Sequence, residues 1–292
     1  KFKKIIGQVK SGVEQGRPLS EVLSDHQDVF PAIYVKMVAS GEVAGKLDEA
    51  LSQIVIQMKK TNALVASIRG AMIYPSVVVT AMVGMGIFMT VVVLPKMIEL
   101  FKDFDAELPL ATRILIAVTT YMSNPINVLI IIAILIGSVV LFITLLKKNL
   151  AFRRLVHTIN LRLPIFGGVV RQINLARFSL TLSSLLKSTI PILDAVDITA
   201  DTCTNLKYRE KLHEASSRMK AGVPLSEILA TAERLFPPMV TEMILVGERT
   251  GEVNRLLAEL SEFYNDEVDK TMKNFTIIIE PVLILVLGVA VA

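Results

Sequence analysis

Apolar residues along the chain follow two patterns, spaced positions within polar stretches and uninterrupted runs between them. In polar stretches such as 171–188, apolar residues recur every three or four positions, which predicts amphipathic helices. Two runs, 76–94 and 126–146, carry no charged residue, and each is about as long as a helix needs to be to cross a bilayer. A third apolar run occupies 276–292. The pattern therefore predicts an all-α membrane protein with three transmembrane helices.

The polar stretches before the first run and after the second contain matching sequences at a constant offset. The phrase GRPLSEVL at 16–23 returns as GVPLSEIL at 222–229, 206 residues later, and identities continue in register without a gap. The recurring glycines, prolines and glutamates are Gly16, Pro18, Gly41, Glu42, Gly45 and Pro75, which return as Gly222, Pro224, Gly247, Glu248, Gly251 and Pro281. A match of this length predicts a duplicated domain.

The runs and the repeated stretches divide the chain into six expected segments. These are a first helical-bundle domain at 1–75, transmembrane helices at 76–94, 126–146 and 276–292, a short loop at 95–125, and a second helical-bundle domain at 147–275. The second copy begins near Gly168, so the offset places about 40 residues of the first copy before residue 1. We therefore expect the first domain and the third transmembrane helix to continue beyond the given sequence.

The distribution of Lys and Arg predicts which segments face the cytoplasm. Residues 147–187 contain eight basic residues and no acidic one, whereas the 95–125 loop contains four acidic and three basic residues. Because cytoplasmic flanks of membrane helices carry the basic excess, both helical domains are expected in the cytoplasm and the loop in the periplasm. The Leu and Phe residues of 147–187 favour contact with membrane lipid over a nucleic-acid groove, so no nucleic-acid ligand is expected.

Composition adds few chemically reactive groups to this picture. Hydrophobic residues make up 52% of the chain, above the about 45–50% of a soluble domain. The lone Cys203 excludes an internal disulfide and is expected in a core. The three histidines, His26, His157 and His213, lie in separate segments without the spacing of metal ligands or catalytic groups. No metal, cofactor or catalytic site is expected, so the protein is not expected to be an enzyme.

The repeated phrase GxPLSExL has the residues of a corner between two helices. Gly16 and Gly222 suit the left-handed position after a helix, and Pro18 and Pro224 suit the first turn of the next one. Further along, long helices are expected to begin near Lys46 and Glu252 and to run into the membrane, with kinks at Pro75 and Pro281.

The second repeated motif, GExxG, is interpreted as a turn between helices. It fails as a phosphate-binding loop, because three residues instead of four separate Gly41 from Gly45 and no Ser or Thr follows Lys46. Its glutamates, Glu42 and Glu248, are expected near helix N-termini, where a carboxylate is stabilising. The alternative is that these two glutamates bind a partner protein.

Three longer stretches resemble one known family. These are FPAIYVKMVASGEVAGKL at 30–47, FPPMVTEMILVGERTGEV at 236–253 and IIIEPVLILVLGV at 277–289. They resemble the type II secretion F family, the inner-membrane platform proteins of type IV pilus and type II secretion machines, and the resemblance covers essentially the whole chain. The stretch SEFYNDEV at 261–268 looks more like the pilus branch.

The resemblance implies a fold, a location and partners. It implies a cytoplasmic six-helix bundle per repeat, no enzymatic activity, and a multi-pass location in the bacterial inner membrane. The implied partners are a hexameric assembly or retraction ATPase, pilins or pseudopilins, other inner-membrane assembly proteins and further copies of the chain. A type II secretion platform stays open as an alternative. A small oligomeric transporter or channel is a third alternative, although the runs 76–94 and 126–146 lack the ionisable residues that polar pathways usually contain.

Overall fold

The computed structural model describes residues 2–89, 124–163 and 166–291, and also positions 93, 96, 117, 120 and 121. Within these residues the regular structure is helical and contains no strand. The all-α part of the fold expectation is therefore confirmed for the described residues. The expected loop at 95–125 lies almost entirely outside them.

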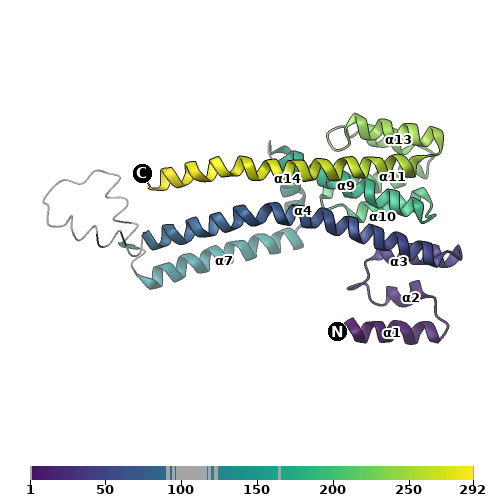
Figure 1. The fold of residues 1–292 in the computed structure, drawn as a ribbon, viewed down its shortest axis with the longest axis horizontal. Coiled ribbons are helices and arrows are strands. Elements are labelled where there is room, and N and C mark those ends of the chain that lie inside the picture. Colours follow the sequence, from purple (N-terminus) through teal and green to yellow (C-terminus); the bar gives the residue numbers. More distant parts are fainter. Residues whose placement is uncertain are drawn as a thin grey trace. The chain divides into compact units, whose positions relative to one another are not determined.

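The chain forms two compact units. The first unit contains residues 1–68 and 154–272, and the second contains residues 69–153 and 273–292. The helices, drawn in Figure 1, are α1 (Phe2–Glu14), α2 (Leu19–Ser24), α3 (Ala32–Val43), α4 (Leu47–Phe88), α7 (Pro125–Lys148), α8 (Leu150–Arg162), α9 (Phe166–Lys187), α10 (Ile192–Thr202), α11 (Leu206–Met219), α12 (Leu225–Ala230), α13 (Pro238–Thr250) and α14 (Val253–Val291). Three of these helices, α4, α8 and α14, contribute residues to both units.

The core of the first unit is built around α9 and an aromatic cluster. The rings of Phe178 and Tyr208 each meet the ring of Phe236 edge-on, with centroids 5.3 and 5.2 Å away. All three residues are fully buried. The hydroxyl of Tyr208 donates a hydrogen bond to the carbonyl of Leu235 (2.7 Å), so the buried ring keeps a partner for its polar atom. This cluster joins α9, α11 and the segment before α13.

Helix α9 is buried on more than one face, although its sequence predicts a single apolar face. Its Thr181 and Ser184 are buried, and both hydrogen-bond Gln57 of α4. The Ser184 hydroxyl donates to Gln57 Oε1 (2.6 Å), and Gln57 Nε2 donates to Thr181 Oγ1 (3.3 Å). Small hydroxyl side chains therefore occupy a second buried face of α9, where α4 packs against it.

The helix expected to begin near Lys46 begins at Leu47 and is continuous for 42 residues, through Pro75, as far as Phe88. Pro75 has no backbone N–H, and the hydroxyl of the next residue, Ser76, donates to the carbonyl of Met72 (2.7 Å). Helix α14, expected from about Glu252, begins at Val253 and runs for 39 residues through Pro281. The kinks expected at the two prolines remain predictions.

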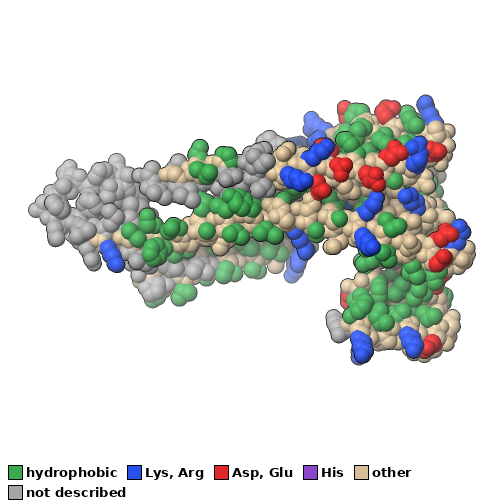
Figure 2. Space-filling model, viewed as in Figure 1, with side chains coloured by type: hydrophobic (Ala, Val, Ile, Leu, Met, Phe, Trp, Pro, Cys, Tyr) green, Lys and Arg blue, Asp and Glu red, His purple; other side chains and the backbone are tan. Residues whose placement is uncertain are grey.

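Two helices are long and apolar enough to cross a membrane. They lie within Leu47–Phe88 and Leu129–Lys148 of the described chain. Figure 2 shows hydrophobic side chains along the second unit, whereas acidic side chains gather over the first. Ile134 of α7 is 66% exposed, and such an apolar surface is typical of contact with lipid or protein. Residues 276–291 of the third expected span belong to α14, and most of the span's side chains lie outside the described part.

The ends of α7 explain where this apolar helix begins and ends. The side chain of Asn124 accepts a hydrogen bond from the N–H of Ile126 (3.0 Å), and Pro125 occupies the first helical position. Lys147 and Lys148 form the last turn, where positive charge is favoured by the helix dipole.

Candidate functional site

Glu42, the glutamate of the first GExxG turn, binds the N-terminus of α2. Its Oε1 accepts a hydrogen bond from the backbone N–H of Leu19 (2.5 Å). Its Oε2 accepts from the backbone N–H of Ser20 (3.0 Å) and from the Ser20 hydroxyl. The first N–H groups of a helix have no partner within the helix and attract negative charge. The carboxylate therefore caps a helix that lies more than twenty residues earlier in the chain.

Glu248 makes the same set of hydrogen bonds in the second half of the chain. Its Oε1 accepts from the backbone N–H of Leu225 (2.7 Å), and its Oε2 accepts from the backbone N–H of Ser226 (3.4 Å) and from the Ser226 hydroxyl. We call Glu42 with Leu19 and Ser20 the first clasp, and Glu248 with Leu225 and Ser226 the second clasp. The first clasp ties α2 to the end of α3, and the second clasp ties α12 to the end of α13.

The repeated prolines explain why these helices need a distant cap. Pro18 and Pro224 lie directly before the first helical residue, at the N-cap position, and not in the first turn as expected. Proline fixes φ near the value required there but has no side-chain acceptor. Neither helix has a side-chain cap from its own N-cap residue. The glutamate supplies the acceptor that Ser, Thr, Asp or Asn would supply at that position.

The glycine of each GxPLSExL motif and the second glycine of each GExxG motif have the left-handed backbone conformation. Gly16 and Gly222 have φ of 85° and 86°, and Gly45 and Gly251 have φ of 65° and 74°. Residues with a Cβ adopt this conformation at a cost, whereas glycine adopts it freely. The left-handed geometry expected at Gly16 and Gly222 is confirmed, and the same geometry closes the two GExxG turns.

Replacing Gly222 with valine is expected to lower the free energy of unfolding by about 1–2 kcal/mol, because a β-branched residue is strained at positive φ. Thermal unfolding of the full chain in detergent measures the change. Gly168→Val is the matched control, since Gly168 is exposed, lies in α9 and has open space around it. Equal melting temperatures for the two variants would contradict the strain argument.

The first glycine of each GExxG motif has a different role, which sequence reasoning missed. A Cβ on Gly41 would lie 2.5 Å from the Cβ of Ala50 in α4. A Cβ on Gly247 would lie 2.8 Å from the Cα of Val253 in α14. Glycine therefore allows the helix before each turn to touch the helix after it, which brings the glutamate into position for the clasp.

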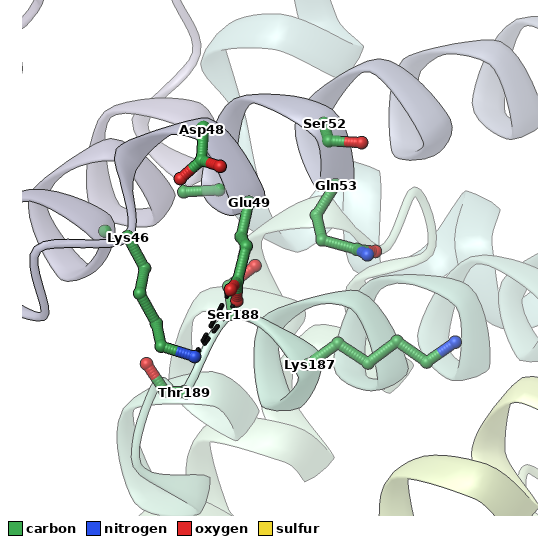
Figure 3. A pocket seen from close by; sticks show the side chains of 10 residues that line it. Lys46, Asp48, Glu49, Ser52, Gln53, Lys187, Ser188 and Thr189 are labelled. Carbon is green, nitrogen blue, oxygen red and sulfur yellow. Dashed lines mark hydrogen bonds and ion pairs between the residues drawn. The ribbon is translucent and has the colours of Figure 1, made fainter.

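A cavity of about 460 Å³ lies beside the first clasp, between the start of α4 and the end of α9. Figure 3 shows that the Lys46 amine points toward Glu49, and the Lys46 Nζ lies 3.2 Å from the Glu49 Oε2. Thr189 has an unusual φ of 59° for a residue other than glycine, and the Ser40 hydroxyl donates to the carbonyl of the adjacent Ser188 (2.8 Å). The cavity wall is thus polar, with Lys46, Glu49 and Thr189 among its lining residues.

Two of the three histidines have hydrogen-bonding or charged partners, and the lone cysteine is buried. Nδ1 of His157 accepts the backbone N–H of Leu206 (2.9 Å), and Nδ1 of His213 lies 2.9 Å from Asp197 Oδ1. Burial raises the pKa of the Cys203 thiol to about 12, so it stays protonated at neutral pH. Within the described residues no group of three or more His, Cys, Asp or Glu side chains is arranged to hold a metal ion.

The described chain is helical and contains apolar helices of membrane-spanning length, and its repeated glutamates cap helices. These features are typical of a membrane-associated structural component. The family model for the type II secretion system (T2SS) protein F matches residues 1–95 and 178–292. The chain belongs to this family. The resemblance seen in its motifs is therefore confirmed.

Relatives come from both pilus and secretion systems. The Type IV pilus assembly protein PilC of Thermus thermophilus is 36% identical over 291 residues, which cover 100% of this chain and 71% of the relative. The protein of the same name from Myxococcus xanthus is 34% identical, over 98% of this chain and 68% of the relative. The Type II secretion system protein F of Pseudomonas aeruginosa is 30% identical, over 97% of this chain and 69% of the relative.

Proposed function

We propose that this chain is an inner-membrane platform protein of type IV pilus biogenesis. The observation that carries the proposal is 36% identity, over the whole chain, to a protein named for type IV pilus assembly. A type II secretion platform is the second candidate, because protein F of a secretion system is 30% identical over 97% of the chain. In either system the protein would act by assembling other proteins and not as an enzyme.

The proposed topology is multi-pass, with three transmembrane helices and both helical domains in the cytoplasm. The two clasps support the duplication, because Ser20 and Glu42 recur as Ser226 and Glu248 and make the same hydrogen bonds. In each half, a long helix, α4 or α14, begins directly after the clasp turn and continues without interruption into apolar sequence.

The proposed mechanism is mechanical coupling. A cytoplasmic hexameric ATPase would bind the helical domains, and pilins would bind the transmembrane helices, with other inner-membrane proteins and further copies of the chain completing the platform. A continuous α-helix is stiff along its axis, because each backbone N–H bonds a carbonyl one turn away. Movement of the helices at a clasp would therefore reach the membrane through α4 or α14.

Deleting the gene from its natural host is expected to abolish surface pili, and expressing the intact protein is expected to restore them. Electron microscopy of the cells measures pili, and an assay of secreted proteins in the same strain serves as the comparison. Loss of secretion with normal pili would favour the type II secretion alternative. Transport of ions or solutes across vesicle membranes by the purified protein, without an ATPase or pilin, would contradict both platform proposals and favour a transporter.

A further inference from the structure

Helix α8 follows α7 in the chain, and hydrogen bonds from one of its faces connect it to α11 and to the residue before α11. Arg154 Nε donates to Glu210 Oε1 of α11 (2.9 Å). Nδ1 of His157 accepts the N–H of Leu206, the first residue of α11 (2.9 Å), and the His157 carbonyl accepts from the side chain of Asn205 (3.1 Å). No residue of α8 itself is buried.

The opposite face of α8 carries an exposed strip of large aliphatic side chains. Leu155, Ile159 and Leu163, the last just beyond the end of the helix, are 56%, 47% and 40% exposed. They are spaced four residues apart and so lie along one side of the helix. Arg154 and His157 lie roughly opposite. The strip is a continuous apolar surface that the described chain leaves uncovered, and such a surface marks an interaction site.

The start of α8 lies beside the apolar part of α7. A single residue, Asn149, separates the two helices, and its side chain accepts the N–H of Phe152 (3.0 Å). The ring of Phe152 meets the ring of Phe142 edge-on, with centroids 5.6 Å apart. Phe142 lies six residues before the end of α7, which is about 9 Å along the helix axis. The chain therefore turns back at Asn149, and the first turn of α8 packs on the apolar helix.

The charged residues in α8 and on either side of it in the sequence are all basic. Lys147, Lys148 and Arg162 are exposed, and the whole stretch 147–187 contains no acidic residue. An amphipathic helix with exposed apolar residues and basic neighbours is typical of a helix that lies in a membrane interface. Anionic headgroups of the cytoplasmic leaflet attract such basic residues.

We propose that α8 lies in the headgroup layer of the cytoplasmic leaflet, with Leu155, Ile159 and Leu163 inserted toward the acyl chains and the flanking basic residues bound to anionic phospholipid. The proposal rests on the proposed membrane crossing of α7. The bilayer is favoured over a protein partner because a single residue separates α8 from the apolar helix α7 along the chain, and because the charged residues that flank α8 in sequence are all basic.

The test places a fluorophore, NBD, on a single engineered cysteine in the full chain, reconstituted in vesicles of phosphatidylethanolamine and phosphatidylglycerol. The positions are Ile159→Cys in the strip, Ile134→Cys in α7, and Ser217→Cys on the exposed surface of α11. The native Cys203 is buried and protonated, so it does not compete for the label. Lipids with a nitroxide near the headgroup, or near the end of the acyl chain, then quench the label according to its depth.

We expect the label at Ile159 to be quenched mainly by the shallow nitroxide, several-fold more than the label at Ser217, and the label at Ile134 mainly by the deep nitroxide. Leu155→Cys should repeat the Ile159 result. Replacing phosphatidylglycerol with phosphatidylcholine, or combining Lys147→Gln, Lys148→Gln and Arg162→Gln, should reduce the shallow quenching at Ile159 and leave Ile134 unchanged.

Two results would overturn the proposal while leaving the membrane crossing intact. One is a label at Ile159 that is as exposed to water as the label at Ser217. The other is a label in an apolar environment that neither nitroxide reaches, which would assign the strip to a contact with protein. Absence of quenching at Ile134 would contradict the proposed crossing of α7 and, with it, the position of α8.

Discussion

Replacing Glu248 with glutamine is expected to lower the free energy of unfolding by about 2–3 kcal/mol, and Glu42→Gln should have a similar effect. Glutamine keeps the side-chain length but replaces one acceptor oxygen with a donor NH₂ group. Both oxygens of Glu248 accept hydrogen bonds, from Leu225 and from Ser226. In the variant, the glutamine NH₂ group faces an N–H or O–H donor at the start of α12, so that hydrogen bond is lost. The N-terminus of the helix also loses the negative charge that its dipole favours.

Thermal and denaturant unfolding of the full chain in detergent measure this effect. Glu227→Gln is the matched control, because Glu227 lies in the first turn of the same helix, is exposed and has no role in the clasp. The control is expected to change stability by less than about 1 kcal/mol. If the proposed ATPase partner binds the chain, both clasp variants should retain that binding below their melting temperatures. Loss of ATPase binding with unchanged melting would instead support the partner-binding interpretation of the two glutamates.

Replacing Gly247 with alanine is expected to cost about 1–3 kcal/mol of stability, because the added methyl group overpacks the contact between α13 and α14. The new Cβ would lie 2.8 Å from the Cα and 3.2 Å from the backbone nitrogen of Val253. Backbone atoms cannot be removed by a second substitution. The turn must therefore open, which also moves Glu248 away from α12.

The corresponding change in the first half, Gly41→Ala, is expected to be partly rescued. There the new Cβ lies 2.5 Å from the Cβ of Ala50, a side-chain atom that Ala50→Gly removes. The double variant should be more stable than the sum of the two single changes predicts, since the two residues are in direct contact. Urea unfolding of the four proteins in this cycle provides the measurement. Additive effects at Gly41 and Ala50 would show that the turn does not depend on this close approach.

Local features of the fold could be predicted from sequence because they depend on a few neighbouring residues. Gly16 and Gly222 follow the ends of helices, and their missing Cβ makes the left-handed conformation favourable whatever surrounds them. The starts of α4 and α14 follow from the GExxG turns in the same way. These features involve the backbone of only one turn, so tertiary packing has little influence on them.

The target of each glutamate could not be predicted in this way, because it depends on how helices pack. Glu42 was expected near a helix N-terminus, and it caps α2, which precedes it by more than twenty residues. A signal was present in the repeat, since Ser20 and Glu42 recur together as Ser226 and Glu248 with the same separation. Residues that recur as a pair at one separation are candidates for direct contact.

The second buried face of α9 was missed for a related reason. Its Thr181 and Ser184 are ordinary polar residues in the sequence, and only the packing of α4, with Gln57, makes them part of the core. Sequence periodicity detects a face that is apolar, but it does not detect a face that is buried through paired hydroxyl and amide groups.

The length of α4 has a consequence for the size of the movements that a clasp can produce. Within the first unit, α4 runs from residue 47 to residue 68, which is about 33 Å of helix. If this part pivots about its first turn, a tilt of about 10° displaces residue 68 by about 6 Å. Glu42 lies five residues before the start of α4 and ties the end of α3 to α2. A tilt of about 10° at the turn would thus move this part of α4 by about half the diameter of a helix.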